Sequence, residues 1–535
     1  MSRAGPAPRA PLGLPAYVLI SFLALGLVWA LASPYAATVD EEANLVKALG
    51  ASTGDLTGEP ATWQDVPLTP AQQRTIDPAT RQFRVPERLA PRGTTRPCFL
   101  LQPTQPASCL KKPAGRVFDR TYVGIYPPLP YVLPGLAARM ANGPVAALFL
   151  ARLAIGIVCL VLLALCLGGI RDSHAPTLSL LGPTVALSPG VLFFAWSVNM
   201  IGLEMMAGLC FLAMCLRLVR HTPPPPSLWI VAAVIGFVLG TSRPLAFVWI
   251  FYAMMVAAIV HGPVTVVRRL RQGGKPAAVM LAVLAAATLS TILWNFMAGT
   301  QTPGGVLSVS ELVRPTLNQI LYVWPVEHIG IVRWGEVELP AQVYLAWKLL
   351  FLAMGSVALA VGTWRQRLAP ILLFVTYLGF SVALIRTTQA GGFDLAPRYL
   401  QPAFMAFPLV WGEVILLNRH RLPPWVCRTL VLVSVTVVAL THGVALLFHG
   451  RRWSVGSTGP WSYLLDGGRW APPGGWLPWT ALGAVGVALL VFGFIKASFK
   501  ESRLGGIAPT KPLRPHVDGG FSVNESPPAR AASTP

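Results

Sequence analysis

The most regular feature of the chain is a succession of apolar runs, each bounded by charged residues, proline or glycine. A membrane-spanning helix needs roughly 20 mostly apolar residues. We therefore predict an all-α integral membrane protein with about twelve transmembrane helices. They are expected near residues 14–33, 145–169, 177–195, 200–218, 227–241, 244–260, 276–297, 342–363, 369–386, 397–417, 425–448 and 475–495. The third to sixth are short and closely spaced, so the count is fixed only to within about two.

The rest of the chain is divided by these runs. Residues 1–13 are predicted to be a cytoplasmic tail and 14–33 the first transmembrane helix, retained because it is long for a cleaved signal and further spans follow. Residues 34–144 form a large first extracytoplasmic loop, and 145–495 the polytopic region. Residues 496–535 are predicted to be a disordered cytoplasmic tail, because Pro, Gly, Ala and Ser dominate its sequence and cannot bury enough apolar surface.

Basic residues give the predicted orientation. If the N-terminus is cytoplasmic, the short connections on that side carry most of the basic residues, namely Arg171, Arg217, Arg220, Arg268, Arg269, Arg271, Lys275, Arg365, Arg367, Arg419 and Arg421. The positive-inside rule then places both termini in the cytoplasm. Residues 34–144, about 296–341 and 449–474 would face outward, as expected for a multi-pass protein of a bacterial plasma membrane.

Composition supports a membrane protein and argues against a nucleic-acid partner. Hydrophobic residues make up 54% of the chain and charged residues only 12%. The formal net charge of +21 could suggest phosphate binding along a nucleic acid. The basic residues lie between apolar runs, however, where they orient helices and contact lipid phosphate. Membrane lipid is therefore the expected partner.

The cysteines do not predict a metal site. Four of them lie inside apolar runs, where a free cysteine behaves as a small hydrophobic residue: Cys159, Cys166, Cys210 and Cys215. Cys98 and Cys109 share the outer loop, where they could form a disulfide. No Cys or His spacing resembles that of a zinc site.

Three carboxylates stand together directly after the first helix, in the segment Thr38-Val39-Asp40-Glu41-Glu42-Ala43-Asn44. Asp40 and Glu41 are the candidate catalytic residues. A structural alternative exists, because acidic residues are favourable in any first helical turn. Thr38 and Glu41 have the spacing of a capping box, and Asp40, Asn44 and Lys47 would share one face of such a helix.

A second candidate segment precedes the second helix. It contains Arg120 and Tyr122, followed by Tyr126-Pro127-Pro128-Leu129-Pro130-Tyr131. Prolines stiffen this segment, and Arg120, Tyr122, Tyr126 and Tyr131 are candidate substrate-binding residues because a tyrosine ring can stack on a sugar. The alternative is an aromatic belt at the membrane boundary.

Polar residues near the outer ends of helices form a third set. Substrate binding is predicted for Asn199, Glu204, Arg243, Arg386, Arg398 and Tyr399. Ionisable groups at such depth usually face a cavity or pair with one another, and arginine binds phosphate through a planar fork of donors. The alternatives are an internal ion pair, for example Arg398 with Asp394, and snorkelling to the interface. Glu327 and His328, in the loop after the seventh predicted helix, are expected to be exposed to solvent.

The order of these motifs resembles that of a bacterial family of uncharacterised polytopic membrane proteins grouped with the GT-C type of glycosyltransferases. Asp40-Glu41 matches an Asp-Glu motif after the first helix. Further matches are the Tyr126–Tyr131 segment, Leu187-Ser188-Pro189, Ser197-Val198-Asn199, Gly202-Leu203-Glu204, Ser242-Arg243-Pro244 and Arg398-Tyr399-Leu400-Gln401-Pro402. Two motifs depart from the family pattern: Glu42-Ala43-Asn44 replaces Pro-Ala-His, and Pro397 replaces a glycine.

The resemblance implies a GT-C-like fold and a glycosyltransferase that takes a sugar from a polyprenyl-phosphate donor on the outer face and transfers it to a glycan acceptor in cell-envelope assembly. In such enzymes a first-loop carboxylate acts as general base on the acceptor hydroxyl or helps to hold a divalent cation. Two other functions remain open: a transporter or flippase of a lipid-linked saccharide, and a non-catalytic scaffold of envelope assembly. We find no repeat between the two halves of the chain of the kind common in transporters.

Overall fold

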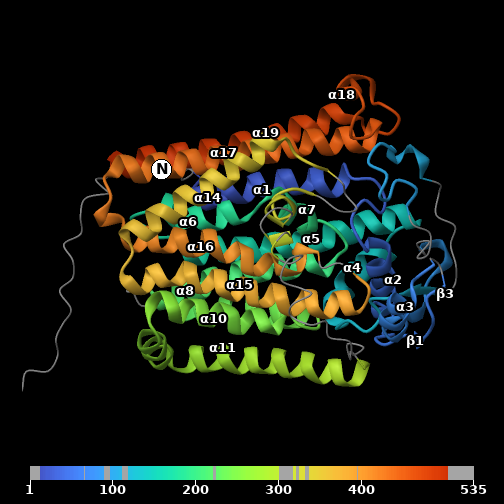
Figure 1. Ribbon diagram of the computed structural model, residues 1–535, viewed down its shortest axis with the longest axis horizontal. Coiled ribbons are helices and arrows are strands. Elements are labelled where there is room, and N and C mark those ends of the chain that lie inside the picture. Colours follow the sequence, from blue (N-terminus) through green and yellow to red (C-terminus); the bar gives the residue numbers. More distant parts are fainter. Residues whose placement is uncertain are drawn as a thin grey trace, which may run out of the picture.

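The chain folds into a bundle of long, roughly parallel and antiparallel helices with a small mixed domain at one end (Figure 1). A computed structural model describes residues 12–64, 67–89, 97–110, 118–220, 224–299, 317, 319–320, 324–331, 337–393 and 396–503. The bundle helices are α1 (Leu14–Leu31), α5 (Pro144–Ile170), α6 (Pro176–Ala186), α7 (Pro189–Ala195), α8 (Met200–Val219), α9 (Pro226–Ser242), α10 (Phe247–His261), α11 (Pro263–Ala298), α14 (Ala341–Val361), α15 (Trp364–Ala390), α16 (Gln401–Leu417), α17 (Pro424–Val455) and α19 (Trp476–Arg503).

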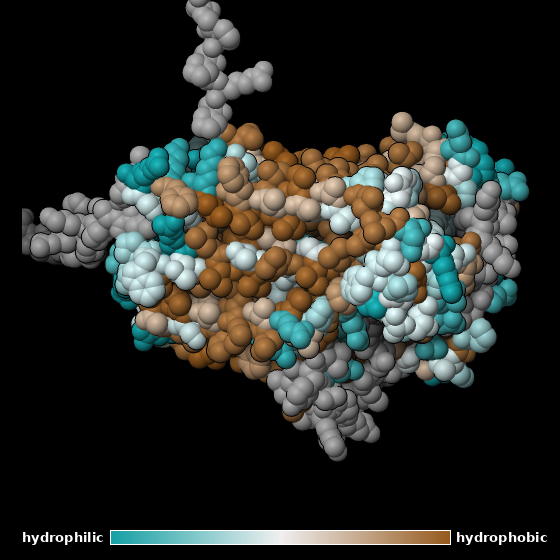
Figure 2. All heavy atoms as spheres, turned by 90° about the horizontal axis from the view of Figure 1, so that it is seen from above, coloured by the Kyte–Doolittle hydropathy of each residue, from teal (hydrophilic) through white to brown (hydrophobic). Residues whose placement is uncertain are grey.

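The surface of the bundle has the apolar character of a protein that lies in a membrane. In Figure 2 a broad apolar belt lies between two more polar ends. Nine of the described helices are long and apolar enough to cross a membrane. Helices α6 and α7, bent by 75° where they meet, form a tenth span if they are taken together.

Each of the twelve predicted runs corresponds to a helix or to the bent pair. Helices α9 and α10 have only 17 and 15 residues, which is short for a span of roughly 20 residues. Both are apolar. The prediction of a membrane protein with many helices is confirmed, and the number twelve stays a prediction.

The predicted disordered tail begins too early, because α19 continues through residues 496–503. Residues 504–535 lie outside the described part of the chain.

The two ends of the bundle differ. The described residues between positions 34 and 144 lie at one end, which we call the loop end, as Figure 1 shows for α2, α3 and the strands. Helices α1 and α19 run antiparallel, and Lys496 donates a hydrogen bond to the Tyr17 hydroxyl. The start of α1 and the end of α19 therefore lie together at the opposite end, which we call the tail end. Their location on the same side is consistent with the predicted topology, and which side is cytoplasmic stays a prediction.

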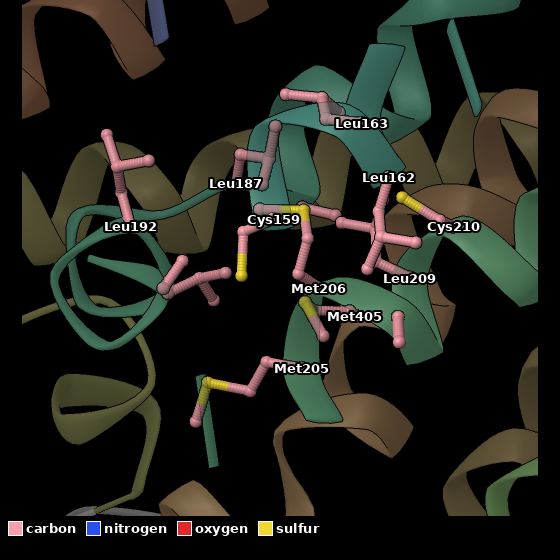
Figure 3. Packing of buried hydrophobic residues seen from close by; sticks show 14 of the residues in the cluster. Cys159, Leu162, Leu163, Leu187, Leu192, Met205, Met206, Leu209, Cys210 and Met405 are labelled. Carbon is pink, nitrogen blue, oxygen red and sulfur yellow. The ribbon is translucent and has the colours of Figure 1, made fainter. Parts of the chain in front are cut away.

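The centre of the bundle is packed with apolar side chains. Figure 3 shows leucine, methionine and cysteine side chains from α5, α7, α8 and α16 meeting around the bend between α6 and α7. The four cysteines predicted to behave as hydrophobic residues are free and buried: Cys159, Cys166, Cys210 and Cys215. Gly26 and Gly156 lie against the ring of Trp196, where an added Cβ would come within 2.1 Å of it. These contacts fix the loop between α7 and α8 next to α1 and α5.

The loop end carries a folded domain. It contains α2 (Glu41–Ala51), α3 (Pro70–Ile76), α4 (Leu129–Arg139) and an antiparallel sheet, β1 (Glu59–Pro60), β2 (Arg81–Arg84) and β3 (Phe118–Thr121), in the order β1-β2-β3. Buried Lys47 of α2 donates from Nζ to the carbonyls of Leu56 and Gly124, 2.6 Å each, and lies over the Phe83 ring. Helix α2 is thereby fixed against the sheet. The chain is mostly helical but not purely α, because it contains these three short strands. The strands were not predicted from the sequence.

The two cysteines of the outer loop are joined. Cys98 and Cys109 form a disulfide that closes a small loop. Buried Arg452 at the end of α17 donates to the carbonyls of Phe99, Gln102 and Gln105 inside that loop. The disulfide loop is therefore attached to the bundle at the loop end.

Candidate functional site

Asp40 occupies the turn between α1 and α2 in a conformation that frees its side chain. Its backbone is left-handed, with φ 61° and ψ 12°, and its side chain makes no capping hydrogen bond to α2. The Tyr122 hydroxyl donates to one carboxylate oxygen of Asp40 over 2.6 Å, and Arg398 lies 3.8 Å from the other. Positive φ is uncommon for a residue other than glycine, although aspartate adopts it more readily than most, and such residues cluster at functional sites. Asp40 is therefore held toward groups outside its own helix.

The predicted capping box is wrong. Thr38 contributes only a backbone carbonyl, which accepts from the Glu41 N–H over 3.4 Å. Asp40 takes the N-cap position instead. Asn44 donates to the backbone carbonyl of Asp40 over 2.7 Å, so the predicted shared face of Asp40 and Asn44 is present. This contact fixes the backbone of Asp40 while leaving its carboxylate available.

Two arginines and two tyrosines lie beside Asp40. The guanidinium groups of Arg243 and Arg398 both face the ring of Tyr399, at 5.0 and 5.2 Å from its centre. Arg243 also faces Tyr126 at 5.7 Å. Within the described residues, the buried Nε of Arg398 has no hydrogen-bond partner. The side chains of Asp40 and Arg398 remain 16% and 15% exposed, so a ligand can reach both.

Arg243 is oriented by a carboxylate behind it. Glu204 accepts from Arg243 over 2.8 Å with one oxygen and from the Trp249 indole N–H over 3.0 Å with the other. Glu204 itself is only 3% exposed. It therefore positions Arg243 and is shielded from direct contact with a substrate.

Helix α11 and the loop-end domain hold the segments that carry these groups. Trp294 donates to the carbonyl of Ile125, next to Tyr126, and Asn295 donates to that of Pro244, next to Arg243, over 2.8 Å in both cases. Gln72 of α3 donates to the Gly392 carbonyl over 3.0 Å, just before the segment with Arg398. Residues far apart in sequence are thereby fixed in one cluster.

Glu41 has a different environment from Asp40. Its carboxylate is 0% exposed and forms two hydrogen bonds with Arg152 of α5, at 2.8 and 2.6 Å. The Val198 N–H also donates to it over 3.0 Å. Arg152 further donates to the carbonyls at the end of α1, namely Ala30, Ser33 and Pro34. Glu41 therefore joins α1, α2, α5 and the α7–α8 loop, and we do not carry it forward as a catalytic group.

Three predicted substrate-binding residues are used for structure. Arg120 donates to the Thr62 carbonyl and the Gln64 amide oxygen in the loop-end domain. Fully buried Tyr131 donates to Asn44 over 2.8 Å. Asn199 caps α8 by accepting from the Ile201 N–H and donates to the Val39 carbonyl. Their predicted contacts with substrate are therefore not part of the proposal below.

Three further predictions concern Arg386, Asp394 and His328. Arg386 lies half-buried near the end of α15, toward the loop end, and its predicted role stays untested. Asp394, the alternative partner of Arg398, lies outside the described residues, whereas Asp40 is the described carboxylate within ion-pair distance of Arg398. The predicted exposure of His328 is wrong.

His328 is 1% exposed and lies between helices. Its Nδ1 is 2.5 Å from the Gln401 amide oxygen, and its Nε2 is 2.8 Å from the Tyr377 hydroxyl. Its carbonyl accepts from Ser188, the N-cap of α7. A loop residue can thus be part of the core when it satisfies the polar groups at a helix break.

The site is electrostatically unusual next to Asp40. Burial and the nearby Asp40 carboxylate raise the pKa of Tyr122 well above its usual 10, so its hydroxyl stays a proton donor. Burial, followed by repulsion from Glu41 and Asp119, raises the pKa of Glu42 to about 8. Glu42 is therefore mainly protonated at neutral pH.

Glu42 makes the stability of the loop end depend on pH. Its ordinary pKa of 4.5 applies to the unfolded chain and its raised pKa to the folded one, so the folded chain keeps a proton that the unfolded chain has lost. Stability is expected to fall as pH rises from about 4.5 to 8, by at most about 1.4 kcal/mol per pH unit. Glu42→Gln should remove this loss, so that its thermal midpoint in detergent exceeds that of the wild type at pH 9 but hardly at pH 5. Exposed Glu59→Gln is the control, and parallel wild-type and Glu42→Gln profiles would contradict the assignment.

The described residues do not fit the divalent cation that the family resemblance allows. Among them, no three His, Cys, Asp or Glu side chains are grouped so that they could hold a metal ion. Both oxygens of Glu41 are occupied by Arg152, and those of Asp40 lie against Tyr122 and Arg398. No step below is assigned to a metal.

Comparison with known proteins identifies the family. A family described as "Predicted membrane protein (DUF2142)" matches residues 23–406. The chain belongs to this family. The matched region contains Asp40, Arg243 and Arg398, so the cluster lies inside the part of this DUF2142 chain that the family model covers.

Solved structures show only a limited likeness to this DUF2142 protein. The apo crystal structure of ArnT from Cupriavidus metallidurans has a TM-score of 0.43 at 13% identity, covering 92% of this chain and 77% of that one. The structure of the same protein bound to undecaprenyl phosphate has a TM-score of 0.40 at 12% identity, covering 92% and 76%. No protein of curated function matches. Such distant likeness does not assign a function to this chain.

Proposed function

We propose that this protein is a membrane glycosyltransferase that takes a sugar from a polyprenyl-phosphate donor on the extracytoplasmic face and transfers it to a glycan acceptor. One observation carries the proposal: the carboxylate of Asp40 does not cap its helix and faces Tyr122 and Arg398 beside a second arginine. A base and two cations at the end of a membrane bundle suit a reaction between a lipid phosphate and a hydroxyl.

Asp40 acts as the general base. The acceptor hydroxyl attacks the anomeric carbon of the sugar, the bond between that carbon and the phosphate oxygen breaks, and the hydroxyl proton moves to the Asp40 carboxylate. Tyr122 donates to one oxygen of that carboxylate over 2.6 Å and orients it. The high pKa of Tyr122 keeps this hydrogen bond in place as the proton arrives.

Arg243 and Arg398 bind the phosphate. When the sugar leaves, the polyprenyl phosphate gains negative charge, which preorganised cations stabilise in a site of restricted water access. Arginine presents several donors in a planar fork that matches phosphate geometry. The ring of Tyr399, which both guanidinium groups face, and the carboxylate of Glu204, which binds Arg243, hold these donors in place.

The direct test is transfer in proteoliposomes. Purified protein is given a labelled polyprenyl-phosphate sugar and candidate glycan acceptors, and both glycosidic product and movement of the intact donor across the bilayer are followed. Product formation with release of polyprenyl phosphate supports the proposal. Movement of the intact lipid-linked saccharide without product would identify a flippase instead.

Arg398→Lys is expected to lower transfer by about ten- to a hundredfold, because lysine keeps the charge and loses the planar fork. The loss should include a higher KM for the donor and little change in the KM for the acceptor. Arg451→Lys, an arginine at the same end outside the cluster, is the matched control. An unchanged donor KM in Arg398→Lys would remove this arginine from phosphate binding.

A further inference from the structure

A basic cavity lies at the tail end of the bundle, at the opposite end from the cluster around Asp40. Its volume is about 190 Å³, and it lies between the start of α6, the start of α17 and the end of α19. Three basic side chains line it: His174, Arg419 and Arg428. The proposed reaction uses none of them.

The cavity lining holds more positive than negative charge, because Arg419 and Arg428 share it with one carboxylate among the described residues, that of Glu501. Both oxygens of Glu501 accept hydrogen bonds from Thr177 at the start of α6, at 2.8 and 2.7 Å. Arg419 donates to the Leu416 carbonyl, and Arg428 stacks on the ring of Phe499 at 4.5 Å. Neither arginine forms an ion pair with any carboxylate in the part of the chain that the structure describes. Both guanidinium groups can therefore accept an anion.

A second feature of the cavity also points to a polar ligand. The hydroxyl of Ser498 lies in the cavity wall, is buried and has no hydrogen-bond partner among the described residues. A buried hydroxyl without a partner is unfavourable, so a ligand oxygen at this position would stabilise it. Arginine donors and a hydroxyl donor together suit the oxygens of a phosphate.

The surroundings of the cavity indicate a lipid as the source of that phosphate. Trp425 lines it and is 69% exposed, and Phe499 next to Arg428 is 50% exposed. Exposed tryptophan beside basic residues is typical of the depth at which lipid headgroups lie. Basic pockets between helices on the cytoplasmic side bind anionic headgroups.

We infer that this cavity, lined by His174, Arg419, Arg428 and Ser498, binds the phosphate headgroup of an anionic phospholipid, with the acyl chains along the exposed apolar faces of α17 and α19. The site is independent of the proposed transfer reaction. It would fix the ends of α6, α17 and α19 to the membrane surface, as a bound lipid stabilises the folded state that holds it.

The test uses the full chain in detergent, titrated with phosphatidylglycerol, phosphatidylcholine or inorganic phosphate. Binding is followed by the thermal midpoint and by native mass spectrometry. Each arginine near a lipid surface contributes about 1 kcal/mol, or roughly a fivefold change in affinity. Arg419→Gln with Arg428→Gln is therefore expected to weaken phosphatidylglycerol binding by about 25- to 30-fold. The matched control is Arg268→Gln with Arg271→Gln, two exposed arginines at the same end outside the cavity.

A second variant keeps the test decisive if the first variant misfolds. Exposed Ser502 also lines the cavity, so Ser502→Trp should obstruct it without removing any charge. Weaker phosphatidylglycerol binding in both cavity variants, with the control unchanged, supports the site. Equal weakening in the control, or full binding in Ser502→Trp, would overturn it. Competition by inorganic phosphate at concentrations equal to those of the lipid would show a site for soluble phosphate and overturn the assignment to lipid.

Discussion

Asp40→Asn is expected to lower sugar transfer by about a hundred- to ten-thousand-fold, the usual contribution of a positioned general base. Asparagine has nearly the same shape, and its amide oxygen can still accept the 2.6 Å hydrogen bond from Tyr122. It cannot take a proton from the acceptor hydroxyl at neutral pH. The side chain is 16% exposed and caps no helix, so the fold should tolerate the change. The measurement is the initial rate of transfer from a labelled polyprenyl-phosphate sugar in proteoliposomes.

The control for this experiment is Glu59→Gln, which removes an exposed carboxylate from β1 in the same domain. Membrane levels and thermal midpoints of both variants should stay close to those of the wild type. A wild-type rate in Asp40→Asn would eliminate Asp40 as the base. A lower rate together with a large loss of stability would show that Asp40 matters for folding, which is not expected of a partly exposed side chain that makes no capping hydrogen bond.

The helices could be predicted from the sequence because a bilayer imposes their length and apolar composition. The sheet of the loop-end domain was missed because its strands are only two to four residues long and carry no regular alternation. The end of α19 was misplaced because Lys496 and Lys500 interrupt the apolar run, although both can extend along the helix toward the interface.

The site could be predicted in part, for a similar reason. Arg243, Arg398 and Asp40 stood out because charges near a membrane are costly, and the structure brings all three together. The local capping rule failed at Thr38 because α2 begins at Glu41, so that Asp40 and not Thr38 is the N-cap residue. Arg152 was missed, although a lone arginine inside the apolar run 144–170 was a signal of the same kind.

Glu41→Gln is expected to destabilise the protein by about 3–5 kcal/mol, the usual cost of breaking a buried ion pair. The change leaves the guanidinium of Arg152 buried without a compensating charge, since Arg152 is 1% exposed. Glutamine can still accept one hydrogen bond, but the second contact, at 2.6 Å, then faces an amide N–H. The thermal midpoint in detergent and the amount of protein in the membrane should both fall strongly. A catalytic or metal-binding Glu41 would instead give a stable protein with a lower rate.

Arg152→Gln completes the comparison. It should lower the stability of the protein at least as much as Glu41→Gln does, because the three carbonyls at the end of α1 lose their donor as well. In the double variant the penalty of an unpaired buried charge disappears, so its loss of stability should be smaller than the sum of the two single losses. Strict additivity would show that the two side chains are not coupled. Asp40 is adjacent to Glu41 in sequence, so the two variants can be compared directly. A loss of rate in Asp40→Asn and a loss of stability in Glu41→Gln would show that Asp40 takes part in the reaction and that Glu41 stabilises the fold.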